Sequence, residues 1–276
     1  MFIQLSPKIS FSKAIIAYRF YMAKYHKLNK AMLIAICFLS ILFIPSIANA
    51  WGPLTHVYLG SQVLEMGAAV IPVGIYALLK KFKDDFLYGN LSADMMLGRR
   101  FQDHDKNSHS WDIAWKLLEV AKTDQQRAFA YGYLTHLCAD TVVHNMEKSG
   151  MPFKHSLLEV KSDSIIEKEH RRTLKKLDKI MQKKNDLFLE DMLDSAFFSF
   201  KTNKRIFKGV LLLSRVPNYS PVSNFIHRRF PYEIPIKDIY DFQQTSIDRM
   251  FDLLKDGEKS KVLNEHPLGR YLKKVS

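Results

Sequence analysis

Hydrophobic positions recur at helical spacing along most of this chain, and the alternation typical of strands is scarce. Glycines, prolines and charged residues interrupt the spacing at residues 89–110, 148–152 and 215–223, which are predicted loops. The predicted fold is therefore all-α, a compact multi-helix bundle. The spacing predicts helices over residues 54–64, 73–87, 111–121, 125–146, 157–183, 187–200, 204–215 and 236–254.

The N-terminal region has the pattern of a secretory signal peptide. An apolar run of about 14 residues at 31–44 follows a lysine-rich flank and precedes Ala48-Asn49-Ala50, a sequence of the kind that signal peptidase cuts. The run is short for a transmembrane helix. We expect residues 1–50 to be removed after Ala50, leaving an exported (periplasmic or secreted) chain, 51–276, as a single helical domain. An uncleaved N-terminal anchor is the alternative reading of this segment. Met22 or Met32 is a more ordinary start for a signal peptide than Met1, and such a start would leave residues 1–21 outside the translated chain.

Composition and charge then narrow the class of protein. A chain of 276 residues with 47% hydrophobic and 25% charged residues is neither disordered, collagen-like nor a polytopic membrane protein. Its formal charge is +13, and because residues 1–50 hold six basic and no acidic residues, the exported chain carries +7. This charge favours anionic lipid surfaces or polyanions without choosing between them. The exported chain keeps only Cys138, so it contains no internal disulfide.

Ionisable residues stand at helical spacing in the predicted helix 125–146. His136, Asp140 and His144 occupy positions i, i+4 and i+8, which lie along one helix face, in a sequence that is otherwise largely apolar. Burying three such groups is costly unless something binds them, and a metal ion does this well. His155 and Glu159 form a second pair, at i and i+4.

Three further candidate ligands lie upstream. His109 stands just before a predicted helix, and Asp94 is the last residue of the segment 89–94 in the predicted loop. His56 lies five residues after Trp51. Any one of them is a weak signal, because a lone histidine is more often a core or surface residue. Taken together, the candidate positions include five of the nine histidines of the exported chain, which favours a metal cluster.

The ordered pattern Trp-Gly-x3-His … Asp … His … His-x3-Asp-x3-His … His-x3-Glu resembles the zinc-dependent phospholipase C family. The resemblance covers about residues 51–159. Glycosylphosphatidylinositol-specific phospholipases D carry a similar module, and fungal single-strand nucleases share the all-helical fold. The resemblance implies a helical bundle around a trinuclear zinc site, and hydrolysis of phospholipids by a zinc-bound hydroxide.

The resemblance also assigns the ligands of this zinc site. The first ion would be held by Trp51, through its new α-amine and its carbonyl oxygen, with His56 and Asp140. The second would be held by Asp94, His109, His136 and the bridging Asp140, and the third by His144, His155 and Glu159. Asp94 would also be the catalytic residue that orients or deprotonates the attacking water.

The sequence leaves three alternatives open for the substrate and the reaction. The expected substrate is a phospholipid at a membrane surface, cleaved on the glycerol side. We expect no stable nucleic acid partner. A zinc-dependent single-strand nuclease or nucleotidase is the second reading, and phospholipase D-type cleavage the third. The short segment between Trp51 and His56 is as in the nucleases, and the spacing of Asp140 and His144 is closer to the phospholipase D module. A zinc-binding protein without turnover is disfavoured, because every expected ligand is present.

Overall fold

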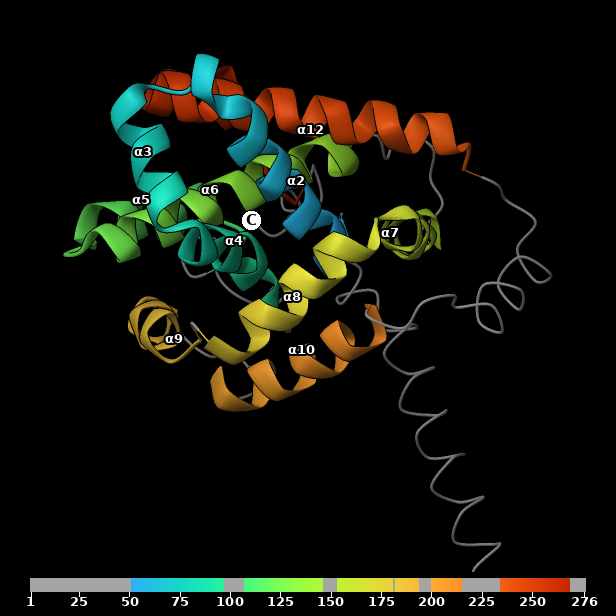
Figure 1. Cartoon of the computed structure of the whole chain (residues 1–276), viewed down its shortest axis with the longest axis horizontal. Coiled ribbons are helices and arrows are strands. Elements are labelled where there is room, and N and C mark those ends of the chain that lie inside the picture. The colour runs from blue at the N-terminus through green and yellow to red at the C-terminus, as the bar shows by residue number, and fades with distance from the viewer. Residues whose placement is uncertain are drawn as a thin grey trace, which may run out of the picture. The chain divides into compact units, whose positions relative to one another are not determined.

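Regular structure in the computed structural model of this chain is helical throughout the residues it describes, 51–96, 107–145, 153–180, 182–193, 200–214 and 234–268 (Figure 1). The predicted signal peptide and most of the predicted loops lie outside them. The described residues all belong to one compact unit, Ser46–Ser276. The helices are α2 (Pro53–Met66), α3 (Val73–Lys81), α4 (Lys83–Ser92), α5 (Trp111–Val120), α6 (Asp124–Asn145), α7 (Phe153–Ile165), α8 (Lys168–Ile180), α9 (Gln182–Glu190), α10 (Phe200–Ser214) and α12 (Ile236–Asp256), with short 3₁₀ turns η1 (Gly67–Ala69), η2 (Ala93–Met95), η5 (Gly257–Lys259) and η6 (Lys261–Asn264).

Helix α6 lies at the centre of the fold. It packs against α4, α5 and α12, with further contacts to α2, α3 and α9. Residues 132–143 of α6 are buried on every side, which explains why this helix lacks the narrow apolar stripe of a surface helix. Among the described helices, none combines the length and apolar character needed to cross a bilayer.

Two glycines let α4 and α6 come into backbone contact. A Cβ atom on Gly89 would lie 2.1 Å from the carbonyl oxygen of Phe129, and one on Gly132 would lie 2.0 Å from that of Phe86. Both distances are far inside van der Waals contact, so no other residue fits at either position without moving the helices apart. Glycine at these positions therefore sets the spacing of the two helices.

The predicted loop at 89–110 is wrong over its first part. Residues 89–92 form the last turn of α4, and η2 continues the chain through Asp94. Gly89 suggested a break, because glycine is a poor helix former. Packing overrides this preference here, because α6 covers the glycine.

Two long predicted helices are in fact interrupted. The predicted helix 73–87 is divided into α3 and α4 at Phe82, whose φ of −113° and ψ of 45° are not helical. The predicted helix 157–183 is divided between α7, α8 and the start of α9, and Ile166 turns into the core between the first two. Apolar spacing continues through both breaks, so periodicity alone does not reveal them.

We predict that Gly89→Ala destabilises the protein, because the new methyl group meets the Phe129 carbonyl. Urea unfolding should show a loss of about 1–3 kcal/mol in the free energy of unfolding. Gly74→Ala in α3 is the matched control, since a Cβ there meets nothing within 4 Å. Equal stability of the two variants would contradict the proposed role of the glycine contact.

Candidate metal centre

The centre is built on α6, which contributes His136 and Asp140 one turn apart. Both side chains are completely buried. The spacing places them on one face, as the sequence predicts, and His136 Nε2 lies 3.3 Å from Asp140 Oδ2. An imidazole and a carboxylate therefore point at the same buried point.

Asp94 and His109 reach this point from segments next to two other helices. Asp94 lies in η2, directly after α4. His109 lies in a turn held by Asn107, whose side-chain oxygen accepts a hydrogen bond from His109 N at 2.9 Å. The next residue, Ser110, caps α5 by accepting from Asp112 N at 3.1 Å. These local bonds explain why His109 has a fixed position outside a helix.

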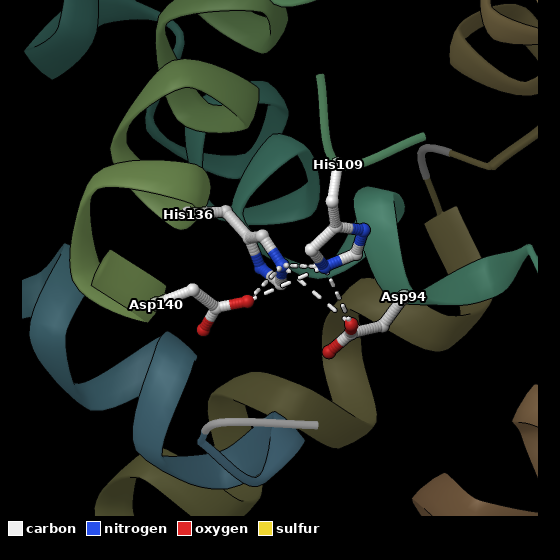
Figure 2. Close-up of side chains that lie close together, drawn as sticks. All are labelled: Asp94, His109, His136 and Asp140. Atoms are coloured by element: carbon white, nitrogen blue, oxygen red, sulfur yellow. Dashed lines mark hydrogen bonds and ion pairs between the residues drawn. The ribbon is translucent and has the colours of Figure 1, made fainter. Parts of the chain in front are cut away.

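The four side chains converge, as Figure 2 shows, with their ligand atoms within 4.8 Å of one another. His109 Nε2 lies 3.2 Å from Asp94 Oδ1 and 3.3 Å from Asp140 Oδ2. His136 Nε2 lies 3.6 Å from Asp94 Oδ1 and 3.2 Å from His109 Nε2. Four atoms that bind one zinc ion tetrahedrally lie about 3.3–3.4 Å apart, given bond lengths of about 2.0–2.1 Å. The observed separations scatter around this value.

Hydrogen bonds behind the imidazoles aim them at the cluster. His136 Nδ1 lies 2.8 Å from the carbonyl oxygen of Asn90 on α4, so this nitrogen carries the proton and donates. His109 Nδ1 lies 3.2 Å from Ser108 Oγ. In each ring the second nitrogen, Nε2, faces the cluster, which is the arrangement that a metal-binding histidine needs.

His56 stands on the other side of Asp140. Its Nε2 lies 3.3 Å from Asp140 Oδ1, while Asp140 Oδ2 faces the cluster of Figure 2. The ring of His56 stacks on that of His136, with centroids 3.9 Å apart. Each oxygen of one carboxylate thus faces a different set of histidines.

Trp51 is buried beside these residues at the start of α2. Its indole Nε1 donates to the carbonyl oxygen of Ala139 on α6 and to Ser246 Oγ on α12, both at 3.2 Å. These bonds hold the Trp51 side chain against Ala139, the residue that directly precedes Asp140 on α6. Ser246 also gives a role to the C-terminal part of the chain, where the sequence pattern was uninformative.

The third predicted ligand set is not tested by the structure. His144 lies in the last turn of α6 and His155 in the first turn of α7, but their side chains lie outside the described residues. Glu159 is half-buried on α7. The third zinc ion stays a prediction.

The comparison with known proteins agrees with this site. The family described as zinc dependent phospholipase C matches residues 55–206, more than half of the chain. The chain belongs to this family. An uncharacterized protein of Archaeoglobus fulgidus is 29% identical over 110 residues, which cover 38% of this chain and 28% of that protein. The chain thus matches little more than a quarter of its curated relative, and no solved structure matches.

Membership of the zinc-dependent phospholipase C family confirms the resemblance seen in the sequence. The description of this family names phospholipase C activity that depends on zinc. The buried cluster of histidines and aspartates fits that dependence.

Buried charge dominates the electrostatics of the site. Burial lowers the pKa of His136, but the carboxylates of Asp140 and Asp94 outweigh burial and raise this pKa to about 10. Burial raises the pKa of Asp140, but the surrounding histidines, His136 first, hold it well below its ordinary value. Burial and then the nearby His136 lower the pKa of His56. Without a cation, the buried carboxylates therefore keep a proton on His136.

Buried polar atoms without hydrogen-bond partners indicate what the site can bind. Both ring nitrogens of His56 and both oxygens of Asp140 are buried, and within the described residues none makes a well-directed hydrogen bond. Leaving such atoms unpaired costs about 1–3 kcal/mol each. Nitrogen and oxygen ligands of this kind suit zinc, so His56, Asp94, His109, His136 and Asp140 fit the metal that the family requires.

Several residues that support the site belong to no metal-ligand pattern in the sequence. Asn90 contributes only its backbone carbonyl, and Ser108 and Asn107 precede a candidate ligand in a predicted loop. Asp163 holds the start of α2 from α7. Only Asp163 was detectable, because it extends the spacing of His155 and Glu159 to i+8.

We predict that zinc binding releases about one proton from His136 near pH 8. Its pKa of about 10 in the metal-free chain keeps the ring protonated there, and Nε2 binds a metal only when deprotonated. Zinc affinity should therefore rise as the pH rises toward 10 and fall as it is lowered. Titration calorimetry in two buffers of different ionisation enthalpy measures the protons released. Zinc binding at pH 8 without proton release would contradict this assignment.

We also predict that Asp140→Asn removes more than one zinc ion per chain, because each carboxylate oxygen faces a different set of histidines. Elemental analysis of the purified protein measures the loss. Asp85→Asn is the matched control: Asp85 is buried outside the cluster and accepts a hydrogen bond from Asn185 at 2.8 Å. Full zinc content in Asp140→Asn would exclude a bridging role.

Proposed function

We propose that this protein is an exported zinc-dependent phospholipase C that cleaves phospholipids on the glycerol side of the phosphodiester. One observation carries the proposal: a single buried aspartate, Asp140, presents one oxygen to His56 and the other to His109 and His136. A carboxylate in this position suits a pair of metal ions that share it, as in two-metal phosphodiester hydrolysis.

The proposed ligands follow from the two sides of Asp140. His56 and the main chain of Trp51 would hold one zinc ion with Asp140, and Asp94, His109 and His136 would complete the other. His144, His155 and Glu159 are the proposed ligands of a third. Bound zinc supplies Lewis acidity, which lowers the pKa of water to near 7 and neutralises charge on a phosphoryl group.

Asp94 is the proposed catalytic residue. Its side chain is buried, and its Oδ1 lies 3.2 Å from His109 Nε2. A carboxylate there can orient the attacking water and accept its proton during attack on phosphorus. Proton transfer of this kind contributes about 10²–10⁴-fold to a rate. His109 would remain fixed by Ser108 while Asp94 acts.

Export forms part of the same proposal. Trp51 N can act as an amine ligand only after the bond from Ala50 is cut, and Ala48-Asn49-Ala50 provides a cleavage site at that bond. The charge of +7 on the trimmed chain favours a phospholipid surface as the place of action. No stable nucleic acid partner is proposed.

We predict that the exported protein begins at Trp51 and converts phosphatidylcholine in vesicles to diacylglycerol and phosphocholine. A chelator should abolish the reaction and zinc should restore it. Asp94→Asn should lower kcat by about 10²–10⁴-fold, whereas Asp85→Asn should retain activity. N-terminal sequencing and product analysis test these points together.

Other products would identify the alternatives. Release of choline with phosphatidic acid would show phospholipase D chemistry. Chelator-sensitive cleavage of single-stranded DNA without lipid turnover would show a nuclease. Activity that survives complete removal of metal would contradict the zinc-dependent proposal itself.

A further inference from the structure

The first turn of α2 lacks a local cap. Four backbone N–H groups at a helix start have no partner within the helix, and a side chain at the N-cap position usually accepts from one of them. Here the N-cap residue is Gly52, which has no side chain, and Pro53 follows with no N–H. Leu54 and Thr55 therefore need acceptors from elsewhere.

Asp163 on α7 supplies these acceptors from 109 positions later in the chain. Its Oδ2 accepts from Leu54 N at 3.2 Å, and its Oδ1 accepts from Thr55 N at 2.8 Å and Thr55 Oγ1 at 2.7 Å. The side chain is buried, and a carboxylate at a helix N-terminus also complements the helix dipole. Both oxygens of Asp163 thus hold one helical turn.

The carboxylate also presses on the residue next to Trp51. A Cβ atom on Gly52 would lie 2.4 Å from Asp163 Cγ and from its Oδ1. The backbone angles of Gly52, φ −72° and ψ 159°, are ones that any residue adopts, so only this contact requires glycine. Arg171 on α8 donates to the carbonyl oxygen of Asp163 at 3.0 Å and ties the end of α7 in place.

The turn that Asp163 holds leads directly into the proposed zinc site. His56 N donates to Gly52 O at 3.0 Å, and His56 Nε2 faces Asp140 Oδ1 at 3.3 Å. The Trp51 indole is fixed separately, by Ala139 and Ser246. Residues 51–56 are therefore held by α6 and α12 through the indole and by α7 through Asp163.

We propose that Asp163 is a positioning residue for the zinc ion that Trp51 and His56 would share with Asp140. Its carboxylate fixes the first turn of α2, and so sets the new N-terminus and His56 at the distance from Asp140 that the ion needs. Asp163 itself does not touch the metal. The inference rests on the proposed zinc site, and its readout is metal binding rather than lipid hydrolysis.

Asp163→Asn tests the proposal in the chain exported with its own leader. Asparagine keeps the size of the side chain but places an NH₂ group against one of the two backbone N–H donors. Competition with a chromophoric chelator should show zinc affinity weakened about 10–100-fold, the usual effect of losing a residue that orients metal ligands. The visible absorption of the protein loaded with Co²⁺ should also change, because it reports coordination geometry.

Asp124→Asn is the matched control. Asp124 is an exposed carboxylate in the first turn of α6, about three helical turns before His136, and it pairs with Arg127 at 2.9 Å. The same substitution there should leave zinc affinity and the cobalt spectrum unchanged. Far-UV circular dichroism establishes that both variants are folded at the temperature of the measurement.

Gly52→Ala provides a second test that keeps the carboxylate. Its methyl group would displace Asp163, so zinc affinity should fall, whereas Gly74→Ala, with open space around the new Cβ, should not change it. This pair carries the test if Asp163→Asn does not fold. Folded Asp163→Asn and Gly52→Ala proteins with wild-type zinc affinity would overturn the inference alone. A wild-type protein that binds no zinc would overturn the proposed function and the inference together.

Discussion

The direct contact between the backbones of α4 and α6 is the constraint on which the candidate site depends. At the Gly89–Gly132 crossing there is no room for a side chain. This spacing brings the carbonyl of Asn90 to His136 Nδ1 and fixes which ring nitrogen faces the cluster. Helix α4 ends three residues after Gly89, and η2 follows it directly and carries Asp94. A structural contact between two glycines thus orients one of the four residues that converge and lies close in the chain to another.

Burying these ionisable groups destabilises the fold, and a bound cation would offset that destabilisation. Two carboxylates and three imidazoles lie in a nearly water-free interior, where an uncompensated charge is strongly unfavourable. In the absence of metal the protein reaches partial balance by protonating His136, which leaves His56 and Asp140 without directed hydrogen bonds. Divalent ions would replace that proton and satisfy those atoms. Stability and metal affinity are therefore coupled through the same residues.

Most of the fold class and part of the site could be predicted from the sequence, because both depend on local periodicity. The spacing of His136 and Asp140 holds in the structure since four residues make about one helical turn. The last turn of α4 could not be predicted, because its glycine is tolerated only through contact with another helix. The capping role of Asp163 could not be predicted either, because a cap from 109 positions away has no sequence signature, although the spacing of Asp163 from His155 and Glu159 marks it as a candidate residue. Both features depend on a contact between distant segments of the chain, which local sequence patterns do not reveal.

The burial of Trp51 has a consequence for the order of events during biogenesis. A peptidase needs its target bond extended and accessible, yet Trp51, which follows the proposed cleavage position, is fully buried, with its indole hydrogen-bonded to α6 and α12. The proposed trimming would therefore have to take place on the translocating, still unfolded polypeptide. A precursor that folded first would bury the proposed cleavage site, so cleavage would have to precede folding.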